Sequence, residues 1–222
     1  MSAPAVGREG AIAREGAIAR LIDGLAADGF AVEPGFVDAG LIDRLDAEAR
    51  ALVDPRAGID GGVGRAGQLH RDQTVRRSRI RWLDGATPAQ RDLLALAEDL
   101  RRALNERLYL GLFEFEAQFA LYEPGGFYAR HRDALAGQRN RVVSLIIYCN
   151  RDWGAEDGGE LIVWRDDDGP PAATVWPHAG TLVLMLAEDI PHEARPARRQ
   201  RTSVAGWFRV NASTPGRPDP AR

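Results

Sequence analysis

The stretch Phe127–Asp133, with the sequence FYARHRD, places a histidine and an aspartate two residues apart. In a β-strand, residues i and i+2 point to the same side, so His131 and Asp133 can reach one metal ion while Arg132 points away. A second imidazole, His192, lies far downstream between Pro191 and Glu193. Two histidines and one carboxylate fill one face of an octahedral ferrous ion and leave three positions open. We therefore predict a metal site at His131, Asp133 and His192.

The sequence around these residues favours β-strands. Residues 141–148 (RVVSLIIY) are rich in β-branched side chains, and residues 180–186 (GTLVLML) form an apolar run before His192. Arg201 begins a further strand-like segment, residues 201–208 (RTSVAGWF). The planar fork of an arginine suits bidentate capture of a carboxylate. A metal with open positions beside such an arginine indicates a chelating oxo-acid cosubstrate.

Five pieces of this chain, in order, resemble the Fe(II)- and 2-oxoglutarate-dependent oxygenases, in particular the oxygen-sensing prolyl 4-hydroxylases and their bacterial relatives. The resemblance runs from about residue 119 to 208, and its pieces are 121–133 (LYEPGGFYARHRD), 148–153 (YCNRDW), 157–161 (DGGEL), 192–194 (HEA) and Arg201 with 206–208 (GWF). Residues 79–84 (RIRWLD) match more weakly. Ala194 and Cys149 depart from the usual pattern, but neither touches the inferred chemistry. Five pieces in register are far more specific than an isolated His-x-Asp.

The resemblance implies a role for six residues and a set of cofactors. His131, Asp133 and His192 would be iron ligands. Arg201 would bind the distal carboxylate of 2-oxoglutarate with help from the Tyr148 hydroxyl, and Tyr122 would line the cosubstrate pocket. Fe(II), 2-oxoglutarate, O2 and, as reductant, L-ascorbate would serve a reaction that yields succinate and CO2. The implied substrate is a prolyl residue in a protein or peptide.

Three other functions stay open at this point. The same chemistry could act on a free amino acid or another small metabolite, which a small-molecule screen would separate from a peptide screen. A cupin-like protein could bind a ligand in this pocket without turnover. A metal-dependent hydrolase is a further alternative, and it predicts zinc with no need for oxygen.

The pattern of elements predicts an α+β fold. From residue 113 on, about eight short strands separated by turns favour a β-sandwich or jelly roll, and they are expected at 113–122, 127–132, 141–149, 160–164, 174–176, 181–186, 192–195 and 201–210. The resemblance narrows this to a double-stranded β-helix. We expect helices ending near Gly29, from Asp38 to about Val53 and from Thr87 to about Leu108, packed on one sheet.

The chain is expected to divide into three parts. Residues 1–112 form an N-terminal helical layer with a substrate-loop region, residues 113–210 form the dioxygenase core, and residues 211–222 form a flexible tail. Residues 55–78 are rich in Gly and Arg and are expected to be a long mobile loop. The Arg-rich segment 65–81 carries a hypothesis of its own, closure over a peptide substrate, with a merely solvated face as the alternative.

Several residues look like ligands or active groups without being predicted as such. His70-Arg71-Asp72 is a second His-x-Asp, but it lies in a polar loop, and a mobile ligand preorganises a site poorly. His178 precedes a core strand and is typical of a turn. Glu193 should point away from the site if its strand is regular.

Composition excludes several classes of function. The net charge is −3, which argues against general nucleic-acid binding, and all 29 basic residues are arginine, which excludes lysine-based Schiff-base chemistry. One cysteine, Cys149, excludes an internal disulfide and fits a reducing compartment. No run approaches the ~20 apolar residues of a membrane span, and no signal peptide is evident. We therefore expect a cytoplasmic protein with no nucleic-acid or membrane partner, and leave the oligomeric state open, with a monomer as the simplest case.

Overall fold

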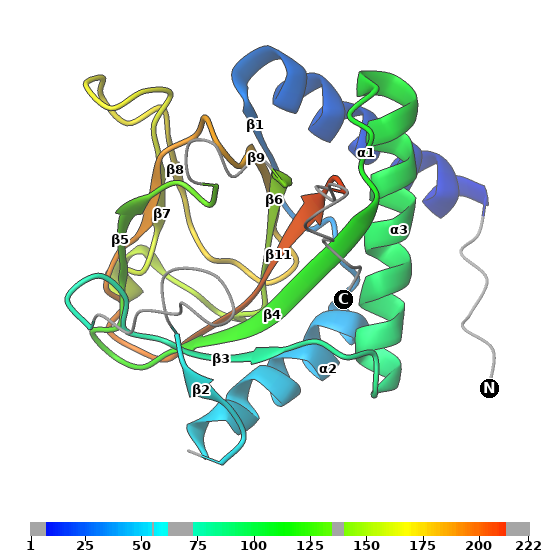
Figure 1. Ribbon diagram of the computed structural model, residues 1–222. Helices are drawn as coiled ribbons and strands as arrows, with labels where there is room; N and C mark the ends of the chain where they lie inside the picture. The colour runs from blue at the N-terminus through cyan, green and yellow to red at the C-terminus, as the bar shows by residue number, and fades with distance from the viewer. Residues whose placement is uncertain (1–7, 55, 62–72, 135–139, 212–222) are drawn as a thin grey trace, which may run out of the picture.

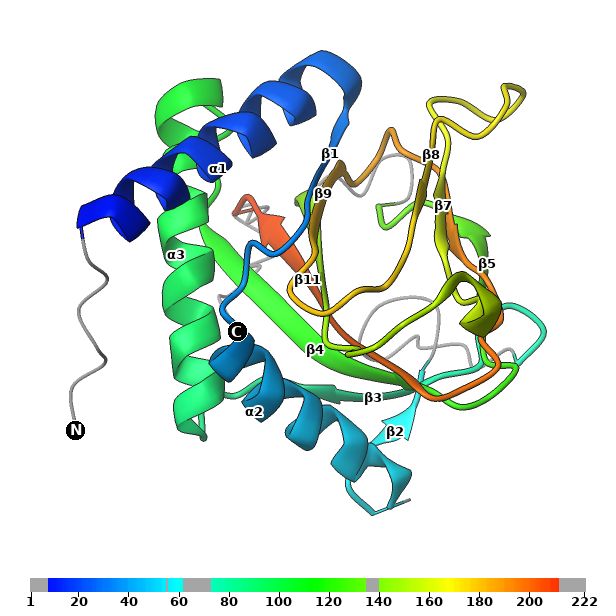
Figure 2. The same cartoon turned by 180° about the vertical axis from the view of Figure 1, so that it is seen from behind.

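Two antiparallel β-sheets face each other, and α-helices cover the outer face of the larger sheet (Figure 1). The computed structural model describes residues 8–54, 56–61, 73–134 and 140–211. Seen from behind in Figure 2, the larger sheet again stands between the helices and the smaller sheet. One side of the space between the two sheets is therefore formed by the larger sheet, whose other face packs against the helices.

The larger sheet has seven strands and the smaller one has four among the described residues. In spatial order, the larger sheet consists of β1 (Phe30–Glu33), β9 (Leu182–Leu186), β6 (Arg141–Tyr148), β11 (Arg201–Arg209), β4 (Glu114–Tyr122), β3 (Arg79–Trp82) and β2 (Ile59–Asp60). The smaller sheet consists of β5 (Tyr128–His131), β10 (His192–Ala194), β7 (Leu161–Val163) and β8 (Ala173–Val175). The helices are α1 (Arg8–Asp28), α2 (Ala39–Arg50) and α3 (Pro88–Leu108), with short 3-10 turns η1 (Ala51–Val53) and η2 (Ala155–Asp157).

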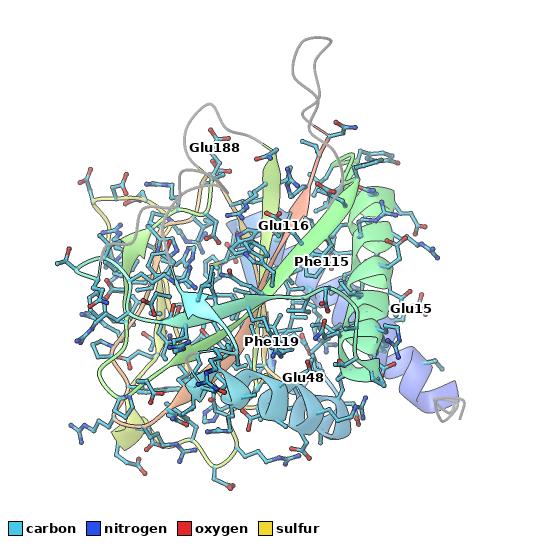
Figure 3. The ribbon with its side chains drawn as sticks, turned by 60° about the horizontal axis from the view of Figure 1, so that its bottom comes forward. Glu15, Glu48, Phe115, Glu116, Phe119 and Glu188 are labelled. Carbon is cyan, nitrogen blue, oxygen red and sulfur yellow. The ribbon has the colours of Figure 1, made fainter. Side chains whose placement is uncertain are left out.

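Strand β4 shows why the larger sheet has one face toward the helices and one toward the cavity. Side chains alternate along a strand, so every second residue lies on the same face. The residues that join the core beneath the helices are Phe115, Ala117, Phe119 and Leu121. The residues on the opposite face of the strand include Glu116, Gln118 and Tyr122, and the last two line the cavity between the sheets. Phe115, Glu116 and Phe119 are labelled in Figure 3.

The N-cap of α3 and the carboxylate of Glu48 fix the helices relative to the sheet. The Thr87 hydroxyl accepts the backbone N–H of Gln90 at the start of α3, where Pro88 occupies the first turn. Glu48 of α2, labelled in Figure 3, accepts hydrogen bonds from Thr87 at 2.5 Å and from the Gln90 amide at 2.8 Å, and pairs with Arg81 of β3. The buried face of α3 carries Leu93, Leu96, Leu100 and Leu104. Three elements are thus joined around one glutamate.

The predicted α+β fold, a double-stranded β-helix with helices on one sheet, is confirmed. All eight strands predicted after residue 113 are present, with each end within one residue of its prediction. The prediction of an unbroken loop at 55–78 is wrong at residues 59–60, where β2 pairs with β3. Strand β3 was not predicted because arginines on both sides of Ile80 hide its single buried apolar residue.

Some predictions concern residues outside the described ranges. These are the second His-x-Asp at 70–72, the arginines 65 and 71, and the tail after residue 211. Within the described ranges, no helix combines the length and apolar character that crossing a membrane requires. Strands β1, β2 and β3 precede residue 112 and complete the larger sheet.

Candidate active site

The two histidines face each other because they are register partners on neighbouring strands. His131 ends β5 and His192 begins β10, and the antiparallel pairing places them opposite each other with ring centroids 4.3 Å apart. Each Nδ1 lies near a backbone carbonyl two residues earlier, Ala129 at 2.8 Å and Ile190 at 3.1 Å. A carbonyl can only accept, so each Nδ1 carries the proton and each Nε2 keeps its lone pair. Both imidazoles therefore offer Nε2 as a metal ligand.

Asp133 completes the cluster and lies two residues after the end of β5. Its Oδ1 lies 3.5 Å from His131 Nε2, and its Oδ2 lies 3.6 Å from His192 Nε2. The Ser144 hydroxyl on β6 donates a hydrogen bond of 2.6 Å to Oδ2. One ligand atom from each of the three residues lies within 4.8 Å of the others. The larger sheet thus orients the carboxylate, whereas the smaller sheet supplies both imidazoles.

The protonation states suit a metal site. Burial lowers the pKa of His192 to about 4, and the adjacent His131 acts in the same direction. Burial alone would raise the pKa of Asp133, but the two imidazoles and the Ser144 hydroxyl hold it below its usual range. At neutral pH His192 is therefore neutral and Asp133 ionised, which are the forms that coordinate metals.

The spacing of the donor atoms fits a single ion. Ligand bonds of about 2.1 Å place neighbouring donors of an octahedral ion about 3 Å apart. The two imidazole–carboxylate separations of 3.5 and 3.6 Å are close to this value, and one donor atom from each residue lies within 4.8 Å of the other two. Two imidazoles and one carboxylate, with no thiolate, match the donor set of non-haem iron.

Arg201 lines the same cavity and is almost fully buried, with 1% of its surface exposed. Its Nη1 donates to the Gly159 carbonyl at 2.5 Å, and its guanidinium carbon lies 4.1 Å from the centre of the Tyr122 ring. Its Nε has no hydrogen-bond partner among the described atoms. A buried cation with an unsatisfied donor is suited to binding an anion.

Tyr148 and Tyr122 line the cavity beside Arg201. Burial raises the pKa of Tyr148 far above its usual range, and the Tyr122 hydroxyl adds to the shift, although Arg201 opposes it. Its phenol therefore stays protonated and can donate a hydrogen bond to a ligand. All six residues predicted from the sequence line one cavity of about 50 Å³.

The side chain of Asn150 fixes the backbone next to Arg201. Its Oδ1 accepts the N–H of Thr202 at 2.7 Å, and its Nδ2 donates to the carbonyls of Thr202 and Pro177 at 3.0 and 2.9 Å. Tyr148 lies two residues before Asn150, and Thr202 follows Arg201. One buried amide thus helps to position Tyr148 and Arg201, two of the three residues predicted to bind the cosubstrate.

Three further residues of the site were not predicted from the sequence. Tyr128 stacks on His131 with centroids 3.5 Å apart, and burial raises its pKa to about 12. Ser144 was detectable as a polar residue within an apolar strand, in phase with Ile146 and Tyr148. Arg76 also lines the cavity, and the sequence pointed to it only as one residue of the Arg-rich segment 65–81, without a place in the metal site.

The look-alike residues take other roles. Glu193 pairs with Arg195 at 2.7 Å, and Arg132 pairs with Asp167 at 3.0 Å on the exposed side of β5. His178 is exposed and lies outside the metal-binding cluster found among the described residues. Alternation along β10 accounts for Glu193, which points away from its neighbour His192.

The fold and the site together define a class, the jelly-roll proteins that hold a metal with two histidines and one carboxylate in a facial arrangement. The family model of the 2OG-Fe(II) oxygenase superfamily matches residues 117–209. A crystal structure of a Pseudomonas putida prolyl-4-hydroxylase is 40% identical, with a TM-score of 0.78 over 86% of this chain and 98% of that one. The chain belongs to the 2OG-Fe(II) oxygenase superfamily, as the resemblance predicted.

The chain is also similar to more distant relatives. Egl nine homolog 1 from Homo sapiens is 27% identical over 190 residues, which cover 81% of this chain and 43% of that protein. The chain spans about half the length of the curated relatives it matches. A Trichoplax adhaerens prolyl hydroxylase, solved with a hypoxia inducible factor peptide fragment, shares the fold with a TM-score of 0.79 at 21% identity, over 91% of this chain and 93% of that one.

Proposed function

We propose that this protein is an Fe(II)- and 2-oxoglutarate-dependent dioxygenase that hydroxylates a prolyl residue in a protein substrate, producing succinate and CO2. The observation that carries the proposal is the convergence of His131, Asp133 and His192 with Arg201 in one cavity. The Pseudomonas putida relative supports the choice of a prolyl residue, since it is named a prolyl-4-hydroxylase and is 40% identical.

His131, Asp133 and His192 would hold the iron through two Nε2 atoms and one carboxylate oxygen. With 2-oxoglutarate and O2, bound Fe(II) supplies the oxidising power needed to hydroxylate an unactivated C–H bond. We infer that L-ascorbate serves as the reductant that keeps the iron ferrous. Ser144 would fix the carboxylate, and the two backbone carbonyls would fix the imidazole tautomers.

Arg201 and Tyr148 would anchor the distal carboxylate of 2-oxoglutarate, while Tyr122 forms the adjoining wall. The three residues are 1%, 2% and 5% exposed, so this charge pairing would take place away from water, where it is stronger. The apolar side chains Ile146 and Leu161 line the same cavity and exclude solvent. Anchoring at one end would aim the keto acid end at the metal.

We further propose that the two parts of the chain, before and after residue 113, have different roles. The core at residues 113–210 carries the six predicted site residues. The part before residue 113 backs the larger sheet with helices and places the segment around Arg76 at the cavity.

The test is conversion of 2-oxoglutarate to succinate in air with Fe(II) and ascorbate. We expect turnover by the parent protein, no turnover by His131→Ala, and weaker 2-oxoglutarate binding by Arg201→Ala. His178→Ala is the matched control, because it removes an exposed histidine that does not belong to the cluster. A parent protein that neither binds Fe(II) or 2-oxoglutarate nor turns over would refute the proposal, and oxygen-independent hydrolysis with zinc would favour a hydrolase.

A further inference from the structure

Arg76 is a buried cation that no carboxylate of the described residues neutralises. The residue is 6% exposed. Its Nε donates to the Ser78 hydroxyl at 2.7 Å, and its guanidinium carbon lies 4.7 Å from the centre of the Tyr128 ring. The ring face attracts the cation but carries no charge. Buried arginines are rare unless they are paired, so the two terminal nitrogens of Arg76 need an explanation.

The backbone holds Arg76 firmly in this position. Its neighbours on both sides are hydrogen-bonded to the β5 region, with Arg77 N–H donating to the Phe127 carbonyl at 2.9 Å and Ala129 N–H to the Val75 carbonyl at 2.8 Å. Gly61 leaves the room that the side chain needs, because a Cβ there would lie 2.7 Å from Arg76 Nε. The guanidinium is therefore preorganised, as expected of a binding group.

Arg76 stands between the metal cavity and an open groove. It lines the cavity that holds His131, and it also lines a neighbouring groove of about 460 Å³. The groove contains the carboxylates of Asp60 and Glu123, but neither forms an ion pair with Arg76, and Glu123 accepts a hydrogen bond from Gln200 at 3.0 Å. A chain that enters through this groove would pass the guanidinium on its way to the metal.

The positive charge of Arg76 is not balanced by the other charged groups that line the cavity. Its lining holds two arginines, Arg76 and Arg201, and a single carboxylate, Asp133. A divalent metal and the dianion 2-oxoglutarate cancel each other, and Asp133 offsets one arginine. One positive charge remains, which one further carboxylate would balance.

We propose that Arg76 binds a carboxylate of the primary substrate, adjacent to the residue that is hydroxylated. This rests on the proposed function, because it names a recognition feature of the same site. The carboxylate comes from an acidic side chain next to the target proline or from the terminal carboxylate of the substrate. In both cases Arg76 would act in substrate binding, separately from Arg201, which faces the cosubstrate.

The experiment uses end-capped peptides in which proline is flanked by Asp, Glu, Asn, Gln or Ala, and a second set that ends in proline with a free or an amidated carboxyl group. Hydroxylation is measured by mass spectrometry. Binding to the protein loaded with Mn(II) and 2-oxoglutarate is measured without turnover. We expect the carboxylate-bearing peptides of one set to bind at least about tenfold more tightly than their neutral counterparts, as a desolvated charge pair implies.

Variants show whether Arg76 causes the preference. Arg76→Gln should abolish it and Arg76→Lys should keep part of it. The matched control Arg91→Gln should keep all of it, since exposed Arg91 donates to the Gly85 and Ala86 carbonyls and lines neither the metal cavity nor the groove. The 2-oxoglutarate affinity of Arg76→Gln reports on whether that variant is folded.

Two outcomes would overturn this inference. The first is that the parent protein binds charged and neutral peptides equally well, or binds neither. The second is that Arg76→Gln keeps the preference for charged peptides. The proposed function fails differently, through absence of 2-oxoglutarate turnover and of hydroxylated proline. Binding to the Mn(II)-loaded protein distinguishes the two failures.

Discussion

At the scale of single residues, the Ser144 hydroxyl shows how a neighbouring strand presents a metal ligand. It donates to Asp133 Oδ2 at 2.6 Å and is 1% exposed. Without it, the carboxylate would lose its orientation and part of the stabilisation of its ionised form. Partners of this kind typically contribute 10–100-fold to metal affinity.

We predict that Ser144→Ala lowers Fe(II) affinity by about 10–100-fold while leaving the fold intact. Isothermal titration with Mn(II) or anaerobic Fe(II) measures the affinity directly. Ser144→Thr retains the hydroxyl and should bind metal more tightly than Ser144→Ala. Equal affinity in the parent and the alanine variant would show that the hydroxyl does not orient Asp133.

Cys149 is the single thiol of the chain, so its reactivity can be measured without interference. It is fully buried, and burial raises its thiol pKa well above the usual range, with Asp46 acting in the same direction. The reactive thiolate is therefore suppressed as long as the protein is folded. We predict no reaction with a disulfide reagent at pH 8 until denaturant is added, and then one thiol per chain. Rapid labelling of the native protein would contradict the buried position.

At the scale of elements, the ends of β6 and β11 depend on one amide. Asn150 makes three hydrogen bonds to the backbone, two with Thr202 and one with Pro177, all in a buried position. Truncation would leave a buried N–H and a buried carbonyl without partners, at roughly 1–3 kcal/mol each.

We predict that Asn150→Ala lowers the free energy of unfolding by about 3 kcal/mol and weakens 2-oxoglutarate binding, because Arg201 precedes Thr202. Urea unfolding gives the first quantity and titration the second. The neighbouring variant Arg151→Ala removes an exposed ion pair with Asp43 and should change both far less. A cosubstrate affinity that is unchanged in Asn150→Ala would separate the amide from Arg201.

The sequence predicted most elements of this fold for identifiable physical reasons. The β-branched residues of 141–148 indicated β6, and the spacing of His131 and Asp133 indicated that both point to one side of the chain. The chain could not reveal which residue of β10 would oppose His131, because register depends on pairing between distant segments. For the same reason, the sequence included Arg76 only within the Arg-rich segment 65–81, because its place at the metal cavity depends on pairing with β5.

At the scale of the whole molecule, the two sheets supply different parts of one site. The smaller sheet brings the imidazoles, and the larger sheet brings Ser144, Tyr148, Tyr122 and Arg201, with helices behind it. Separating the sheets would separate the metal ligands from the residues that orient the cosubstrate. We propose that this assembly inserts oxygen from O2 into a prolyl residue.

The most direct test of that claim is oxygen-isotope tracing with heavy-oxygen dioxygen, Fe(II), ascorbate, 2-oxoglutarate and a prolyl peptide that the protein converts. Mass spectrometry then follows the label in the peptide and in succinate. We expect one labelled oxygen in the hydroxylated proline and one in succinate, in equal amounts. The variant His131→Ala should form neither labelled product. Product whose new oxygen comes from water, or peptide conversion without succinate, would contradict it.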